Sequence, residues 1–190
     1  PYLLLGNIQP ALQRSVRRQM DGVRLAGGDT MNYWIQGCRE ELLETIREWD
    51  FLLINDSEAR LLSGESVLRR AAAAILELGP RILVVKRGEY GAVLFTAGGC
   101  FSVPGYLLDR VLDPTGAGDC FAGGFIGYLA ENGAGSRTGP LDMALLRRAV
   151  VYGSVMGSFC CEGFGVDRFR GLTRAEIDGR FREFKASTDF

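Results

Sequence analysis

The sequence predicts an α/β fold with a mostly parallel sheet. Its 190 residues are 47% apolar and 24% charged, a composition typical of one globular domain. Short apolar runs of strand length alternate with longer amphipathic segments along the first half of the chain. Repetition of strand and helix is typical of βαβ units, in which helices cover a parallel sheet.

Four apolar runs are predicted as buried strands, at residues 2–5, 23–26, 51–54 and 82–85. The amphipathic segments predict helices at 11–20, 40–49 and 65–78. The runs 91–95 and 100–104, separated by a short Ala-Gly-Gly segment, predict an antiparallel hairpin. Further helices are expected at 115–129, 141–161 and 174–184, the last beginning with a capping box formed by Thr173 and Glu176. The Gly-rich stretch 131–140 is expected to be a surface loop, so the chain is predicted to form one domain.

Charge and composition exclude several classes of protein. The 22 basic and 23 acidic residues give a net charge of −1, which does not favour binding to nucleic acid or to an anionic membrane. The longest mostly apolar stretch, 149–161, is too short to span a bilayer. The complete absence of histidine excludes Ser-His-Asp and Cys-His catalysis and His-ligated zinc. Five cysteines without metal-type spacing favour reduced thiols in a cytoplasm.

A dinucleotide-dependent oxidoreductase is also disfavoured. Such an enzyme needs a Gly-x-Gly-x-x-Gly turn after its first strand. Here the first predicted strand leads instead into residues 7–10, with the sequence Asn-Ile-Gln-Pro.

The segment 113–119, with the sequence DPTGAGD, is the strongest candidate for a functional site. Small residues turn the chain from a strand end into a helix, and backbone N–H groups at a helix N-terminus bind anions such as phosphate. Asp119 then lies in the first helical turn, where a bound polyphosphate would repel its carboxylate. An acid at that position suits a general base that takes a proton from an attacking hydroxyl. The alternative is that Asp119 only caps the helix.

Asn55 and Glu58 form a second candidate site. Asn55 ends the strand 51–54, and ligands of open α/β sheets collect at the carboxyl ends of strands. Glu58 follows one helical turn later, and an amide with a carboxylate suits hydrated Mg²⁺, which uses few protein ligands. The alternative is an ordinary capped helix start.

A third candidate is the turn containing Lys86, Gly88 and Gly91, which leaves the strand 82–85. Two glycines allow a tight turn over a ligand, and Lys86, one of only two lysines, could reach phosphate oxygens. A hairpin turn with a solvent-facing lysine is the alternative.

Together, these three motifs resemble the ribokinase-like (PfkB) family of carbohydrate and nucleoside kinases. The segment 113–119 and its Phe-Ala-Gly-Gly sequel are similar to the C-terminal signature of that family, Asn55-x-x-Glu58 to its Asn-x-x-Glu motif, and Lys86-x-Gly88-x-x-Gly91 to its nucleotide-contacting turn. Order and spacing agree across essentially the whole chain. The resemblance implies a three-layer α/β/α sandwich and ATP-dependent phosphorylation of a primary hydroxyl on a sugar or nucleoside.

The resemblance also implies roles for individual residues. Asp119 is expected to be the base, and the backbone of Gly116, Ala117 and Gly118 the anion hole around the transferring phosphoryl group. Asn55 and Glu58 are expected to order Mg²⁺ and its water shell. Thr115 is expected to lie at the nucleotide site, and Asp113 and Thr115 to contribute to a monovalent-cation site.

Family members carry an N-terminal portion with early strands and a β lid over the acceptor, and no segment here matches it. The chain is therefore expected to be the C-terminal two-thirds of a full domain. Asn32, in a turn after a central strand, is a candidate for acceptor binding, with a capped helix start as the alternative. In this family the lids of two subunits often form dimer contacts, so the sequence leaves open whether this chain forms a homodimer. The alternative function is a nucleotide-binding fragment or degenerate kinase with a role in binding or assembly.

Overall fold

The computed structural model describes residues 1–133, 139 and 142–188 of the chain. Its strands form one six-stranded sheet in the order β1 (Tyr2–Leu5), β2 (Leu25–Gly28), β3 (Phe51–Asn55), β4 (Ile82–Lys86), β5 (Ala92–Thr96) and β6 (Gly99–Val103). The pairs β1–β2, β2–β3 and β3–β4 are parallel. Two residues join the neighbouring strands β5 and β6, and so short a connection permits only an antiparallel pair. The predicted α/β fold with a mostly parallel sheet is confirmed.

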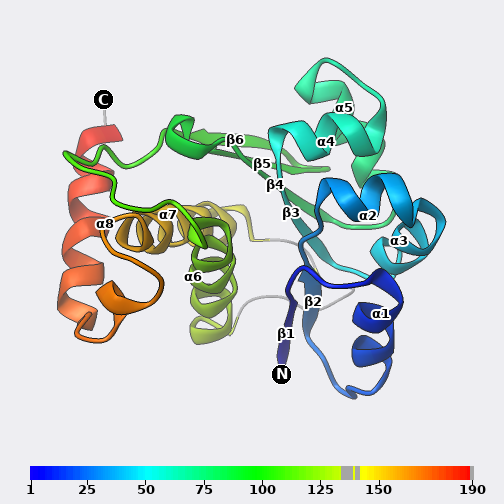
Figure 1. Ribbon diagram of the computed structural model, residues 1–190, viewed down its shortest axis with the longest axis horizontal. Coiled ribbons are helices and arrows are strands. Elements are labelled where there is room, and N and C mark those ends of the chain that lie inside the picture. Colours follow the sequence, from blue (N-terminus) through cyan, green and yellow to red (C-terminus); the bar gives the residue numbers. More distant parts are fainter. Residues whose placement is uncertain (134–138, 140–141, 189–190) are drawn as a thin grey trace. The chain divides into compact units, whose positions relative to one another are not determined.

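Helices follow the strands along the chain (Figure 1). They are α1 (Pro10–Arg18), α2 (Asn32–Gly37), α3 (Arg39–Ile46), α4 (Asp56–Ser63), α5 (Leu68–Leu76), α6 (Ala117–Glu131), α7 (Met143–Cys160) and α8 (Arg174–Thr188), with short 3₁₀ turns η1 (Gly88–Tyr90) and η2 (Asp167–Phe169). Most of the predicted surface loop 131–140 lies outside the described residues. No helix within residues 1–133 and 142–188 combines the length and the hydropathy that a bilayer crossing needs.

The second strand begins two residues later than predicted and contains two glycines that the prediction left outside it. A Cβ at Gly27 would lie 2.0 Å from the Phe51 carbonyl oxygen, and one at Gly28 would lie 2.1 Å from the Leu5 carbonyl oxygen. Only glycine lets the backbone of β2 fit at these two positions. The predicted strand at 23–26 is present, but its bounds were placed two residues too early.

The described chain divides into two compact units. The first comprises residues 1–87, 93–101 and 139, and the second comprises 88–92, 102–133 and 142–188. Strand β6 contributes residues to both, since the division falls after Phe101. The prediction that the whole chain forms a single domain therefore stays a prediction.

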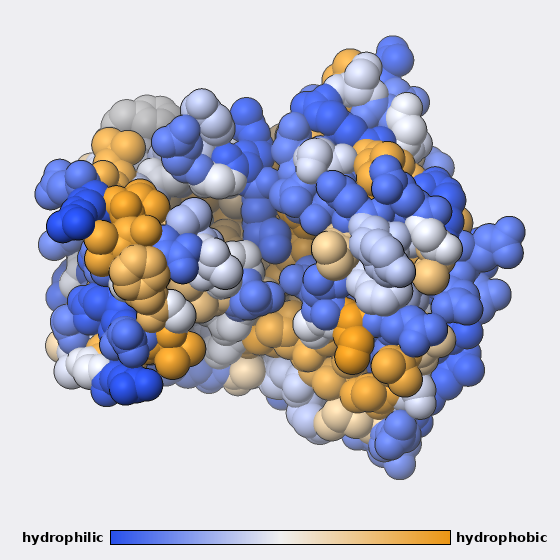
Figure 2. Space-filling view, viewed as in Figure 1, coloured by the Kyte–Doolittle hydropathy of each residue, from blue (hydrophilic) through white to orange (hydrophobic). Residues whose placement is uncertain are grey.

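The core of the first unit lies against β3 and β4. Alternate residues of these strands, Leu52 and Ile54 with Leu83 and Val85, pack with helix residues such as Leu42 and contribute to one buried cluster. The intervening residues of both strands are also completely buried. Burial of the first four residues of each strand explains why those positions are all apolar, and the half-buried last residues, Asn55 and Lys86, are polar. Figure 2 shows a hydrophobic patch near β1 and α1, where Ile8, Leu12 and Val16 are among the exposed apolar residues of this unit.

The second unit is built around the packing of α6 on α7. A Cβ at Gly124 would lie 2.7 Å from the Met156 Cγ, so the helices approach too closely for a side chain at that position. Tyr152 of α7 stacks on Tyr128 of α6 and on Phe181 of α8, with ring centroids 4.4 and 4.5 Å apart. These aromatic contacts join α6, which follows the DPTGAGD segment, to α7 and α8.

Candidate functional site

The segment 113–119 forms a tight turn that ends in the N-terminus of α6. Gly116 is the N-cap residue and has φ 83° and ψ −2°, a left-handed conformation that strongly favours glycine. The Ala117 N–H donates to the Pro114 carbonyl at 3.1 Å, and the Cys120 N–H donates to the Gly116 carbonyl at 2.9 Å. The glycine thus allows the chain to reverse and begin the helix within three residues.

The start of α6 has backbone donors without acceptors. Within the part of the chain that the structure describes, the N–H groups of Gly116, Gly118 and Asp119 have no hydrogen-bond acceptor. Ala117, predicted as part of the anion hole, uses its N–H within the turn. Such a helix N-terminus carries a partial positive charge and suits an anion.

Asp119 projects from the same first turn and is exposed to solvent. No side chain caps α6, so the alternative role of Asp119 as a capping residue is not observed. Among the described residues, none donates a hydrogen bond to its carboxylate. Asp119 is therefore a carboxylate available to an incoming ligand beside the unsatisfied N–H groups.

The turn is held by Asp113 and by the end of α7. The Asp113 Oδ1 accepts a hydrogen bond from the Thr115 N–H at 2.9 Å, and hydrogen bonding with Thr115 lowers the pKa of the Asp113 carboxyl below its ordinary value. The Cys161 carbonyl accepts from the Leu112 N–H at 2.8 Å. The Cys160 thiol donates to the Thr115 carbonyl at 3.4 Å. Sequence reasoning missed these α7 contacts, because no local pattern links residues almost fifty positions apart.

In the first unit, Asn55 and Glu58 form a reciprocal cap at the start of α4. The Asn55 Oδ1 accepts from the Glu58 N–H at 2.8 Å, and the Glu58 Oε2 accepts from the Asn55 N–H at 2.8 Å. The capped helix start anticipated as the alternative is therefore present. Glu58 is only 8% exposed, and this burial raises the pKa of its carboxyl above the ordinary value.

Lys86 lies beside this pair. Its Cα is the register partner of Asn55 across the parallel strands β3 and β4, so both residues end neighbouring strands at the same edge of the sheet. The positive charge of Lys86 opposes the effect of burial and lowers the pKa of Glu58. An amide, a carboxylate and an ammonium group thus meet at one sheet edge, where ligands collect in α/β folds.

The other predicted residues lie at a 3₁₀ turn or at a helix start. Gly88 begins η1 and Gly91 follows it, with φ 59° and 89°. A Cβ at Gly91 would lie 2.0 Å from the Val103 carbonyl oxygen, so packing within the second unit alone requires glycine there. Asn32 is exposed and begins α2, which agrees with a helix start at that position.

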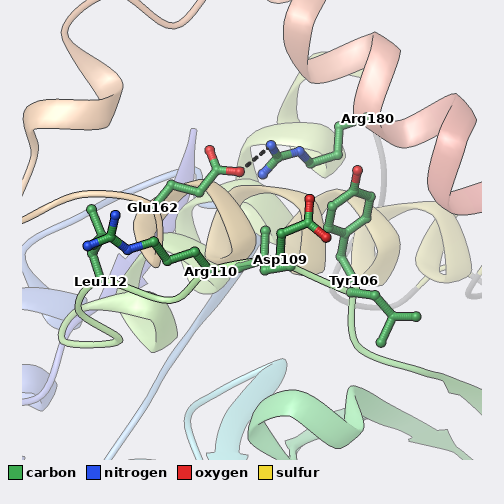
Figure 3. A pocket seen from close by; sticks show the side chains of 8 residues that line it. Tyr106, Asp109, Arg110, Leu112, Glu162 and Arg180 are labelled. Carbon is green, nitrogen blue, oxygen red and sulfur yellow. Dashed lines mark hydrogen bonds and ion pairs between the residues drawn. The ribbon is translucent and has the colours of Figure 1, made fainter.

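A cavity of about 340 Å³ in the second unit contains none of the predicted site residues. Its walls come from the loop before the turn, from Glu162 just after α7 and from Arg180 in the middle of α8 (Figure 3). Arg180 and Glu162 lie side by side in its lining as an ion pair of 2.5 Å, and Arg180 also lies 3.6 Å over the ring of Phe159. Because Ser158 also accepts from Arg180, at 3.0 Å, this guanidinium is bound within the unit itself.

Comparison with known proteins shows related sequences. A family model described as "pfkB family carbohydrate kinase" matches residues 8–168. Fructokinase-2 of Zea mays is 31% identical over 124 residues, which are 65% of this chain and 36% of that protein. Cytidine kinase of Thermococcus kodakarensis is 32% identical over 93 residues, 47% of this chain and 33% of that protein. The chain spans about a third of the length of these curated relatives.

Two solved structures show the same fold. The nucleoside kinase of Methanocaldococcus jannaschii has a TM-score of 0.76 at 24% identity, over 95% of this chain and 56% of that one. The aminoimidazole riboside kinase of Salmonella enterica, complexed with aminoimidazole riboside and an ATP analog, has a TM-score of 0.72 at 23% identity, over 95% of this chain and 64% of that one. At these identities the likeness establishes the fold.

Proposed function

Because this chain belongs to the pfkB family of carbohydrate kinases, we propose that it transfers the γ-phosphoryl group of ATP to a hydroxyl of a sugar or nucleoside. The observation that carries the proposal is the first turn of α6. There an exposed carboxylate, Asp119, lies beside backbone N–H groups that have no acceptor among the described residues. Phosphoryl transfer needs a base for the attacking hydroxyl together with donors for the charge on the transferring group.

In the proposed reaction, Asp119 accepts the proton of a primary hydroxyl of the acceptor. The hydroxyl oxygen forms a bond to the γ-phosphorus as the bond between that phosphorus and the β–γ bridging oxygen breaks, and ADP leaves with the electron pair. The N–H groups of Gly116 and Gly118 donate to the phosphoryl oxygens as their charge shifts. Donors that are already oriented before the reaction stabilise that charge without reorganisation.

Asn55 and Glu58 would hold Mg²⁺ through part of its water shell. When bound, this ion neutralises the phosphate charge. The donor set fits, because amide and carboxylate oxygens are ligands of Mg²⁺, and a cation would offset the burial that raises the pKa of Glu58. For a monovalent cation, the Asp113 carboxylate and the Thr115 carbonyl oxygen are available oxygen ligands in the second unit. Each already accepts one hydrogen bond and retains a further lone pair.

The acceptor is proposed only as a class. Some relatives are named for fructose, cytidine and aminoimidazole riboside, and each of these compounds carries a sugar hydroxyl. Asn32 is a candidate to bind such an acceptor, since it is exposed and follows β2. The alternative function is nucleotide binding without transfer.

The test is phosphoryl transfer from Mg-ATP to a panel of fructose, ribose, cytidine and adenosine by the wild-type chain and by Asp119→Asn. Asparagine keeps the shape of the side chain and removes the base, so we expect transfer to fall about 100- to 10,000-fold while the affinity for Mg-ATP changes little. Asp21→Asn removes an exposed carboxylate in the first unit and is the control. Near-normal turnover by Asp119→Asn would refute the role of this residue. ATP binding without transfer to any acceptor would favour the alternative function.

A further inference from the structure

The Cys160 thiol lies beneath the turn that leads into α6. Cys160 is the last residue of α7 and is 2% exposed, and its Sγ donates to the Thr115 carbonyl at 3.4 Å. The next helical donor along the chain, the Asp119 N–H, does not reach that carbonyl. Within residues 1–133 and 142–188, the thiol is therefore the hydrogen-bond donor to the Thr115 oxygen.

Close packing of the two helices brings the thiol to this position. A Cβ at Gly157 of α7 would lie 3.2 Å from the Ala117 carbonyl oxygen, so the glycine lets the end of α7 approach the first turn of α6. One residue after Cys160, the Cys161 carbonyl accepts from the N–H groups of Leu112 and Asp113 at 2.8 and 3.4 Å. The end of α7 thus contacts the turn at both its entrance and its middle.

The hydrogen bond to the Thr115 carbonyl also affects the direction of the Gly116 N–H, because both groups belong to the same peptide. Residues 1–133, which include this turn, contain no cis peptide bond, and in a trans peptide the C=O and the following N–H point in opposite directions. With the Thr115 oxygen held toward the buried thiol, the Gly116 N–H points away from Cys160. Gly116 has no side chain to resist rotation of this peptide, so the thiol hydrogen bond restrains it in addition to the Ala117 N–H to Pro114 carbonyl bond that closes the turn.

We propose that Cys160 is a positioning residue that sets the direction of the Gly116 N–H, and thereby the anion hole, through its hydrogen bond to the Thr115 carbonyl. This inference rests on the proposed kinase function for its consequence in phosphoryl binding. Its geometric part, that the Cys160 thiol orients the peptide group between Thr115 and Gly116, can be tested without measuring any activity.

The neighbouring thiol is consistent with this role. Burial, together with a hydrogen bond to Cys160, raises the pKa of the Cys120 thiol to about 12. Cys120 therefore stays protonated near neutral pH and adds no negative charge beside the anion site. A thiolate there would repel a phosphoryl group.

The test compares Cys160→Val with Cys160→Thr, two side chains of nearly equal shape of which only threonine keeps a donor. Titration calorimetry measures binding of Mg-ADP alone and of Mg-ADP with aluminium fluoride, which mimics the transferring phosphoryl group. We expect Cys160→Val to bind Mg-ADP within about twofold of wild type but to lose about 10- to 100-fold in affinity for the fluoride complex, the worth of one hydrogen bond to a charged group. Cys160→Thr should recover most of the loss, and Cys161→Ala should behave as wild type.

A second measurement decides the geometry without a nucleotide. In NMR spectra, the ¹³C carbonyl shift of Thr115 and the amide shift of Gly116 should move in Cys160→Val and return toward wild-type values in Cys160→Thr. Equal shifts in the two variants would overturn the proposal, and so would an equal loss of affinity for both ligands, which indicates a general structural role. A wild-type chain that binds neither ligand would refute the proposed function, whereas the NMR comparison would still decide whether Cys160 orients the peptide.

Discussion

Gly116 combines a left-handed backbone conformation with a place in the proposed anion hole. Its φ of 83° is costly for any residue with a Cβ, although a Cβ there would meet only the Cys160 Sγ, at 3.7 Å. We therefore expect Gly116→Ala to lower the free energy of unfolding by about 1–2 kcal/mol, through backbone strain and not through a clash. Urea denaturation of the purified chain measures this difference.

Gly127→Ala is the matched control for that substitution. Gly127 lies inside α6, and a Cβ there would meet nothing within 4 Å. Alanine favours a helix interior over glycine, so this variant should gain about 0.5–1 kcal/mol. Two variants that change stability in the same direction would contradict the assignment of strain to Gly116.

The helix start at segment 113–119 was predictable from local sequence, whereas the roles of its residues stay predictions. The small residues of segment 113–119 and the acid that follows them indicate an anion site without any knowledge of the fold, and the structure places Asp119 at a helix start. Two other relationships depend on tertiary structure. The pairing of Asn55 with Lys86 follows from strand register, and the contact of Cys160 with Thr115 follows from helix packing. Neither leaves a signal in a single sequence.

Elements were predictable where their apolar pattern is strong. Strands β3 and β4 begin at the predicted residues, since the first four positions of each are buried and therefore apolar. Strand β2 was misplaced, since Gly27 and Gly28 have low strand propensity and are retained for close contact with neighbouring strands. Steric requirements between strands act only in the folded sheet, and sequence periodicity does not reveal them.

The start of α8 carries a pH-dependent contribution to stability. Hydrogen bonds from the Thr173 backbone and side chain, and then from Arg168, lower the pKa of the Glu176 carboxyl from 4.5 to about 2. A lowered pKa in the folded state stabilises the fold above the unfolded pKa and loses that effect as the pH falls toward the folded value. We expect the difference in unfolding free energy between wild type and Glu176→Gln to be full above about pH 4.5 and to shrink toward pH 2.

Chemical denaturation at a series of pH values between 7 and 3 measures that difference. Glu77→Gln, which removes an exposed carboxylate after α5, is the control and should leave the pH dependence unchanged. A difference for Glu176→Gln that stays constant across this range would show that the capping box does not hold the carboxylate in its charged form.

At the scale of the whole molecule, the sequence contains no linker that would indicate two compact units. Among residues 1–133, the division falls in the turn after β4, within β5 and within β6, where composition shows no change. Each unit is made of several segments that alternate along the sequence, so a local sequence pattern does not reveal where one unit ends and the other begins. If the chain is one domain, as predicted, the two units should unfold together, and thermal unfolding can test this.

We expect the chain to unfold in one cooperative thermal transition and Mg-ATP to raise its midpoint. A ligand that binds only the native state at a hundred times its Kd adds about 2.7 kcal/mol to stability. For a chain of this length that stabilisation corresponds to a rise of roughly 5–11 °C. Mg-GTP is the control for nucleotide preference. Two separate transitions would show that the units unfold independently, and a midpoint unchanged by Mg-ATP would contradict the nucleotide site on which the proposed transfer depends.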